Sequence, residues 1–399
     1  MKHYIILTSG ILEMGGAEMF TANKSKYLKS KGWDVRVFYY RNLGELKIKE
    51  LAEFQRNCIP ELLFCITYIP QKRRSQIIAK ICEGINKGDE VIVESHLIGL
   101  AYWGEMVAKY CDGKSIINAM EENIDPFSEK EATFVEYKLK RWEILNAVGT
   151  KTLHRYFNDR YKDEYAQYTH NCMRAFCSNV VSDAETSLNL PSEGQSIMSI
   201  GRLDKPYIMP MFEEIKKFVS RNKDKKYNVL VIGGSPDGSV EKNVEALFAN
   251  ESNVALYMYG YVFPVPRNLI NKADVGVATA NSILVTADQG IPTIAMDIHD
   301  FQPIGIYGRT SKNQFTRDDE PILPVSTWLS EVLDLGKYPK IAPTEMDVDA
   351  ELERVFGKQV EFLALSPNDH QYYDVEGVYP QTAYIKNQFK KFIRDIIKK

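Results

Sequence analysis

The sequence alternates short apolar runs with longer segments of helical periodicity, and this rhythm limits the fold more than any other feature. Residues 3–8, 34–40 and 90–94 are rich in β-branched and aromatic side chains, whereas residues 17–31 and 98–110 carry apolar side chains at helical spacing. Strands that alternate with helices in this way build parallel βαβ units. We therefore predict an α/β protein with doubly wound parallel sheets. The further expected strands are 62–68, 115–118, 197–200, 228–232, 254–257, 275–278 and 291–296, and the further expected helices are 76–86, 211–222 and 265–272.

A polar stretch near the middle of the chain divides this pattern. Residues 186–196 (TSLNLPSEGQS) contain Pro191 and Gly194, and the strand–helix rhythm restarts after them. We expect an N-terminal Rossmann-like domain over 1–190, a second one over 191–375, and an amphipathic terminal helix within 376–399. Ligands of open α/β sheets bind at the carboxyl ends of strands, so the expected active site is a cleft between the two domains.

Composition excludes several classes of protein. Hydrophobic residues form 44% and charged residues 26% of the 399 residues, which is typical of a globular chain, and a net charge of −3 gives no basic excess for nucleic acid. No apolar run reaches the roughly 18 residues of a membrane span, and the start of the chain lacks a signal-peptide pattern, which predicts a cytoplasmic protein. The six cysteines form no CxxC pair and the histidines lack ligand spacing, so we expect buried reduced thiols and no metal site.

Two glycine-bearing loops are candidates for phosphate binding. Gly15 and Gly16 follow the first strand (GILEMGGAE) and open a helix, whose free N–H groups suit an anion. Arg202 ends a later strand (SIGRLDK), where its guanidinium can hold two phosphate oxygens, and Lys205 adds a second charge. The alternative interpretations are a plain turn for the glycines and a solvated loop for the two cations.

Two further positions carry polar side chains at strand ends. Asn281 and Ser282 lie at a strand-to-helix turn, where hydroxyl, amide and backbone groups fit phosphate or ribose oxygens. His96 follows the strand at 90–94, where it serves either a site or a structural hydrogen bond.

Taken in order, these blocks resemble the retaining GT-B glycosyltransferases of family 4. The blocks that carry the resemblance are Gly15-Gly16-Ala17-Glu18, Gly201-Arg202-Leu203 with Lys205, Ile232-Gly233-Gly234, Tyr259-Gly260-Tyr261-Val262 through Asn271-Lys272-Ala273-Asp274-Val275, and Thr286 to Ala295 (TADQGIPTIA). Their order and spacing span nearly the whole chain.

The resemblance implies a metal-independent enzyme with no cofactor, whose substrate is a nucleotide-sugar bound mainly by the C-terminal domain. The acceptor would bind the N-terminal domain, and the terminal helix would pack back onto it. The catalytic residues that it implies are Arg202, Lys205, Glu121 and His96, and the donor-binding residues are Gly15, Gly16, Gly233, Gly234, Tyr261, Asn281 and Ser282. Three positions depart from the family. Val285 stands where a glutamate usually grips the donor ribose, and Tyr207 stands where the family lysine usually lies, with Lys205 shifted. Glu121-Glu122 stand where the family often has a histidine near the sugar.

The predicted function is sugar transfer to a glycan or lipid-linked acceptor in the assembly of a polysaccharide, capsule or glycoconjugate. The alternative is a non-catalytic GT-B-like protein that binds a glycan or a partner, which the valine at 285 favours. A nucleotide-sugar 2-epimerase would need acidic and histidine residues that the sequence lacks. Basic residues on the helix at 17–31 and on the terminal helix predict attraction to an anionic inner membrane surface, alongside packing of the apolar face.

Overall fold

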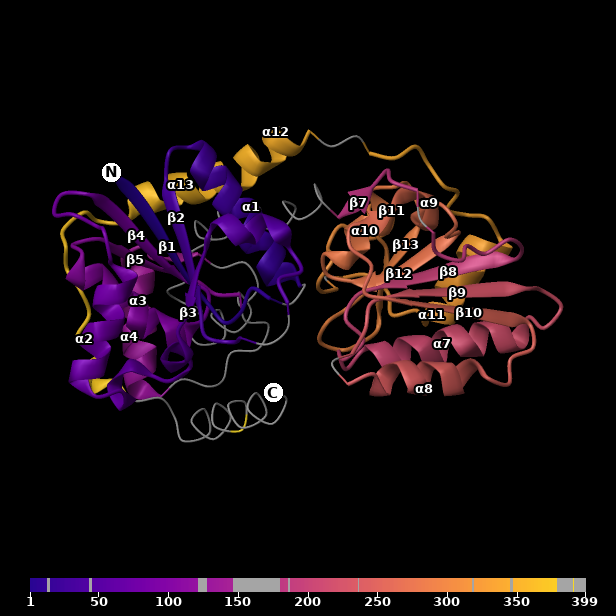
Figure 1. The fold of residues 1–399 in the computed structure, drawn as a ribbon. Helices are drawn as coiled ribbons and strands as arrows, with labels where there is room; N and C mark the ends of the chain where they lie inside the picture. Colours follow the sequence, from indigo (N-terminus) through magenta and orange to yellow (C-terminus); the bar gives the residue numbers. More distant parts are fainter. Residues whose placement is uncertain are drawn as a thin grey trace. The chain divides into compact units, whose positions relative to one another are not determined.

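The computed structural model describes residues 1–12, 15–42, 45–120, 128–145, 180–185, 187–235, 237–317, 319–344, 347–378 and 390. The chain divides into two compact units (Figure 1): unit 1 comprises Met1–Ala175 and Val348–Lys399, and unit 2 comprises Phe176–Asp347. Each unit has a wholly or mostly parallel sheet covered by helices on both faces, as the alternating pattern predicts. The predicted cleft between the units stays a prediction.

Unit 1 contains, within the described residues, a six-stranded parallel sheet in the order β3-β2-β1-β4-β5-β6. The strands are β1 (Lys2–Thr8), β2 (Asp34–Tyr39), β3 (Gln55–Cys58), β4 (Glu90–Ser95), β5 (Lys114–Asn118) and β6 (Ile144–Leu145). Residues 62–68, expected as a strand, instead form the 3-10 turns Pro60–Leu63 and Ile66–Tyr68. Leu62, Leu63 and Ile66 are buried. The carbonyl of Phe64 accepts the Trp103 indole N–H at 2.9 Å, so burial rather than strand pairing explains this run.

The helices of unit 1 follow from local signals and from burial. They are α1 (Gly16–Ser30), α2 (Gln71–Ile81), α3 (Ile98–Tyr110), α4 (Glu129–Lys140), α12 (Val348–Leu352) and α13 (Lys358–Leu365). Ser128 and Glu131 form a reciprocal capping box that starts α4. Gly32, at φ +84°, follows the last turn of α1. In Figure 1, α1 lies on the side of the strands away from α2 and α3.

The chain returns to unit 1 at Val348, earlier than the expected residue 376. The reason is that the side chains of this return segment (residues 348–378) find their partners on unit 1. The Phe356 ring packs 5.3 Å from that of Phe20, and Arg141 holds Asp369 by two hydrogen bonds of 3.0 and 2.6 Å. The amphipathic helix predicted after residue 382 lies outside the described residues, apart from residue 390.

Unit 2 repeats the architecture within its own described residues. Its six-stranded sheet has the order β10-β9-β8-β12-β13-β14, in which the last strand is antiparallel. The strands are β8 (Gln195–Ile200), β9 (Tyr227–Ile232), β10 (Val254–Gly260), β12 (Val275–Thr279), β13 (Thr293–Met296) and β14 (Pro303–Ile306), with a separate pair of β7 (Val181–Ser182) and β11 (Val265–Pro266). The helices are α7 (Ile208–Arg221), α8 (Ser239–Phe248), α9 (Arg267–Ile270), α10 (Ser282–Ala287) and α11 (Val325–Leu329).

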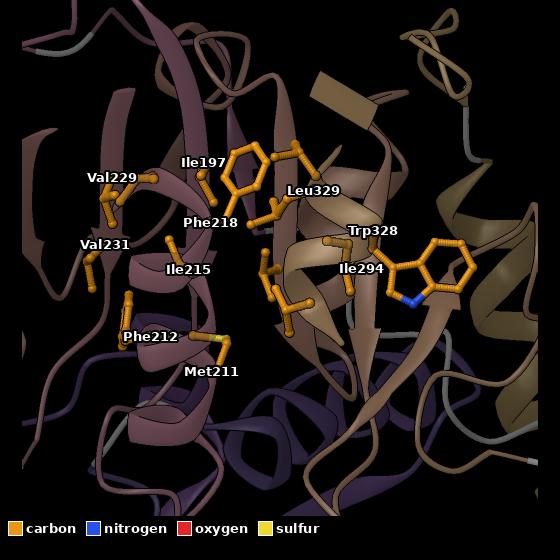
Figure 2. Close-up of a cluster of buried hydrophobic side chains, with 14 of the residues drawn as sticks. Ile197, Met211, Phe212, Ile215, Phe218, Val229, Val231, Ile294, Trp328 and Leu329 are labelled. Carbon is orange, nitrogen blue, oxygen red and sulfur yellow. The ribbon is translucent and has the colours of Figure 1, made fainter. Parts of the chain in front are cut away.

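Two apolar layers hold this second sheet. Met211, Phe212, Ile215 and Phe218 recur at helical spacing along α7 and pack on the strands from one side (Figure 2). Leu329 and Trp328 of α11 extend the same cluster. On the other face, α9 and α10 bury a smaller cluster around Met198, Leu230 and Ile232. Helices therefore cover both faces of this sheet with apolar side chains, and the strand ends are left at its edges.

Candidate functional site

The second sheet has one point where the chain changes direction along the strand order. β8 lies between β9 and β12, and the three strands are parallel. The chain leaves β8 and β9 for α7 and α8 on one face, and leaves β12 for α10 on the other. Ligands of open α/β sheets bind outside the carboxyl ends of strands at such a point. The carboxyl edge of β8 and its neighbours is therefore the candidate site.

Glycines form the backbone at this edge. Gly201 follows β8 at φ +148° and Gly233 follows β9 at φ +134°. A Cβ on Gly233 would stand 1.8 Å from the carbonyl oxygen of Gly201, and a Cβ on Gly234 would stand 2.7 Å from the Tyr261 ring. Larger residues do not fit here, so the strand ends approach each other as bare backbone.

Arg202 follows directly, and 45% of its side chain is exposed. Its guanidinium donates to both carboxylate oxygens of Asp204, at 3.0 and 2.6 Å. Burial raises the pKa of Asp204, but the hydrogen bonds and charge of Arg202 outweigh it and lower this pKa overall. Arg202 thus holds an anion in the two-pronged geometry that also fits phosphate.

Lys205 lies beside the same carboxylate. Its charge contributes to the lowered pKa of Asp204, and its carbonyl accepts the Ile208 N–H at 3.1 Å where α7 begins. The structure therefore brings the two predicted cations, Arg202 and Lys205, together near the glycine edge.

The loop after β9 is held by its own side chains. The Tyr261 hydroxyl donates to the carbonyl of Gly234 at 2.8 Å, although 54% of Tyr261 is exposed. Glu241, in the first turn of α8, accepts from the Ser235 N–H at 2.6 Å and from the Ser235 hydroxyl. Burial raises the pKa of Glu241, and the Ser235 hydrogen bonds bring it below its usual value. Gly233, Gly234 and Tyr261, all predicted donor residues, therefore share one small region.

Asn281 and Ser282 complete this edge from β12. The Ser282 hydroxyl lies 3.4 Å from the position that a Cβ on Gly201 would take. The Asn281 amide oxygen accepts from the side chain of Gln314 at 2.7 Å, and Gln314 is 6% exposed. Sequence reasoning missed Gln314, because it lies in a loop 33 residues away without any motif around it.

Val285 has a structural explanation. It is 7% exposed and packs in the apolar cluster that contains Met198, Leu230 and Ile232. A carboxylate there would lose its hydration without gaining a partner. The position expected to hold a glutamate is therefore part of the core in this chain.

The corresponding edge of unit 1 is filled by its own polar side chains. β1 and β4 are neighbours at the change of direction in that sheet. Glu94, on β4, is fully buried and accepts hydrogen bonds from Lys24 of α1 and Tyr4 of β1, and from Asn118 of β5 at 3.0 Å. The carboxylate oxygen that accepts from Asn118, Oε1, also lies 3.1 Å from Nε2 of His96.

His96 is therefore placed as a member of this buried network. It is 1% exposed, and its Nδ1 lies 3.2 Å from the hydroxyl of Thr8. Both ring nitrogens thus have partners inside unit 1, which is the structural alternative that the sequence left open. Its predicted catalytic role stays a prediction, and Glu121 lies outside the described residues.

Gly15 and Gly16 lie at the start of α1, the helix that carries Lys24. Gly15 is the N-cap in extended backbone, without a side-chain cap, and a Cβ there would stand 2.7 Å from the Glu18 carboxylate. Gly16 is the first helical residue. The structure therefore places the two glycines in unit 1, and their predicted role in donor binding stays a prediction.

Lys24 corrects the prediction of a basic surface on this helix. It is 2% exposed, and its ammonium group donates to Glu94 and, at 2.6 Å, to Gln359 of the return segment. Burial raises the pKa of Glu94, but the charges of Lys24 and His96 and their hydrogen bonds lower it far below its usual range. Lys29 and Lys31 are exposed and pair with Glu53 and Glu353. Lys24, one of the lysines that suggested a basic face on α1, is therefore a core residue.

Neither a metal cluster nor a membrane span is found in the part of the chain that the structure describes. Among the described residues, no three His, Cys, Asp or Glu side chains gather as ligands for an ion. In that same part, each helix is too short or too polar to cross a bilayer.

Comparison with known proteins identifies the fold. No family model and no curated protein matches the sequence. Among solved structures, a glycosyltransferase from Rickettsia africae ESF-5 is similar over 99% of both chains, with a TM-score of 0.53 and 14% identity. Alr3699/HepE from Anabaena, solved with UDP-glucose, is similar over 91% of this chain and 98% of its own, with a TM-score of 0.54 and 11% identity. The chain therefore has the two-domain GT-B fold.

Proposed function

We propose that this chain is a glycosyltransferase that moves a sugar from a nucleotide-sugar donor, and that the donor phosphates bind at the carboxyl edge of the unit 2 sheet. The observation that carries the proposal is the exposed guanidinium of Arg202 beside backbone that only glycine can form, at Gly201 and Gly233. The UDP-glucose bound to Alr3699/HepE, which shares the fold, supports a donor of this class.

The proposed chemistry follows from the charges at this edge. As the sugar leaves, negative charge develops on the diphosphate, and Arg202 with Lys205 would stabilise it by direct electrostatic contact. These cations supply what a divalent ion supplies elsewhere, so we propose transfer that needs neither metal nor cofactor. The finer proposals, retention of configuration and a glycan or lipid-linked acceptor in polysaccharide assembly, rest on the sequence resemblance.

Nucleotide binding to Arg202→Ala tests this proposal. Loss of a charge-assisted hydrogen-bond donor costs about 1.5–3 kcal/mol, so UDP should bind roughly tenfold to a hundredfold more weakly in calorimetry. Arg354→Ala is the matched control, because Arg354 is 40% exposed and holds Glu351 through two similar hydrogen bonds in unit 1. Equal UDP affinity in both variants would remove Arg202 from the donor site.

A second candidate function is a non-catalytic GT-B-like protein that binds a glycan or a partner. The burial of Val285 in the core favours it, because the usual ribose-binding carboxylate is missing. Release of free nucleotide from UDP-, GDP- and CMP-sugars, measured with and without EDTA and acceptor glycans, separates the two. Tight donor binding without release across the panel supports the second function, and release that EDTA abolishes contradicts metal independence.

We further propose a cytoplasmic protein that meets lipid-linked acceptors at an anionic membrane surface. With Lys24 buried, this proposal rests on the exposed lysines of α1 and on the basic residues after 382. Co-sedimentation with vesicles containing anionic lipid, at low and high salt, measures the association. A protein that stays in the supernatant at low salt would indicate a soluble acceptor.

A further inference from the structure

Two cysteine thiols of unit 1 meet at the ends of adjacent helices. Cys82 follows the last residue of α2 and Cys111 the last residue of α3. Both sulfur atoms approach one carbonyl oxygen, that of Val107, at 4.0 Å from Cys82 and 2.9 Å from Cys111. They thus form a pair although 29 positions separate them in the sequence and no motif joins them.

The two members of the pair differ in environment. Cys82 is 6% exposed, whereas Cys111 is half-buried. The hydrogen bond from Cys82 lowers the pKa of Cys111, while Asp112 opposes this shift; the same bond, together with burial, raises the pKa of Cys82. A thiolate is the nucleophile in thiol chemistry, so Cys111 is the member that reacts first and Cys82 is the resolving thiol.

We propose that Cys82 and Cys111 form a redox-responsive dithiol, which a low-molecular-weight disulfide converts to an intramolecular disulfide. The Cys111 thiolate attacks one sulfur of the small disulfide and forms a mixed disulfide, and one small thiolate leaves. Cys82 then loses its proton and attacks the Cys111 sulfur, which releases the second small thiol. Two cysteine thiols are oxidised and one small disulfide is reduced to two thiols, so electrons and protons balance.

This cross-link would enclose β4 and α3. The loop from Cys82 to Cys111 contains Glu94 and His96, the centre of the buried polar network. Closing it removes conformations from the unfolded chain, so the oxidised protein should melt at a higher temperature than the reduced one. The inference is independent of the proposed transferase activity.

Oxidised glutathione and peptide mapping test the inference on the folded full-length protein. After oxidation, the thiols that remain free are alkylated and the protein is digested. We expect a linked Cys82–Cys111 peptide that carries no alkyl group and is about 2 Da lighter than the sum of its two reduced peptides. Cys82→Ser should leave Cys111 as a stable glutathione adduct, because the resolving thiol is gone. Cys58→Ser is the matched control, since Cys58 is also half-buried and its sulfur also lies near a carbonyl, that of Tyr40 at 3.4 Å.

Each result decides the question. A linked peptide in the wild type and in Cys58→Ser supports the dithiol. Cys111 that reacts no faster than Cys58, or that remains a mixed disulfide in the wild type, overturns it. The mapping of the wild-type protein is sufficient even where a serine variant fails to fold.

Discussion

The two sheets share one strand order, apart from the antiparallel direction of the last strand in unit 2, but their carboxyl edges are built in opposite ways. In unit 1 the edge is closed by a buried carboxylate, Glu94, whose partners come from α1, β1 and β5, while Lys24 of α1 also donates to the return segment. In unit 2 the edge consists of glycine backbone and a guanidinium, that of Arg202, with 45% exposure. The first arrangement satisfies its charges internally, and the second leaves a cation at the surface.

This difference shows that a switch point by itself does not indicate a phosphate site. A buried ion pair contributes to the integrity of its unit, since either partner alone would be an uncompensated charge. An exposed ion pair such as that of Arg202 with Asp204 contributes little to folding. Stability should therefore respond to changes in the first edge, and nucleotide affinity to changes in the second.

The largest effect should come from Lys24→Met. This change leaves Glu94 buried without its ammonium partner, which costs about 3–5 kcal/mol of unit 1 stability. Urea unfolding followed by tryptophan fluorescence in a Trp328→Phe background reports unit 1 alone, because Trp33, Trp103 and Trp142 lie there. Lys29→Met, on the same helix but in an exposed pair with Glu53, should cost less than about 1 kcal/mol. Equal losses in both variants would contradict the difference between a core pair and a surface pair.

Acidification should lower the stability of unit 1 through the same buried carboxylate, Glu94. The pKa of Glu94 is lower in the folded chain than the unfolded value of about 4.3, so its contribution is complete above that value and is lost as the pH falls toward the folded pKa. The loss should not exceed that caused by Lys24→Met. Unfolding of the wild type and Glu94→Gln between pH 7 and pH 3 measures it. The wild type should lose more stability on acidification, and identical pH slopes would exclude Glu94 as the cause.

An intermediate effect is expected at the glycine edge of unit 2. Gly233→Ala must place a Cβ 1.8 Å from the Gly201 carbonyl at φ +134°, so we expect a loss of about 3 kcal/mol and a large loss of UDP affinity. Gly238→Ala is the control, because Gly238 also has positive φ but has open space around its Cβ position. It should cost about 1 kcal/mol. Hydrogen exchange should localise both losses to unit 2.

The smallest effect should follow Asp204→Asn. Removing the carboxylate that Arg202 holds should raise UDP affinity by less than about 1 kcal/mol, since exposed pairs are weak. Calorimetry against Glu351→Gln, which removes the partner of Arg354, provides the comparison. If Asp204→Asn binds UDP more weakly, then Asp204 positions Arg202 for the donor instead of competing with it.

Sequence reasoning reached the unit 2 edge because its features are local. Gly201, Arg202 and Gly233 each end an apolar strand, and strand ends are visible in the apolar pattern. The unit 1 network could not be predicted from the sequence, because Lys24 contacts Glu94 across 70 positions and Gln359 across 335. A lysine in a basic helix has the same appearance in sequence whether it faces solvent or a buried carboxylate. Val285 was noticed as a departure, but only its apolar neighbours explain it.

The discontinuity of unit 1 has a consequence for biosynthesis. On a ribosome that adds about 5–20 residues per second, roughly 20 to 70 seconds separate Lys24 from Gln359. All of Phe176–Asp347 is synthesised in that interval, so unit 2 is complete while unit 1 still lacks its last segment. Until Phe356 arrives, the ring of Phe20 is without this cover, and the nascent chain exposes apolar surface that chaperones recognise.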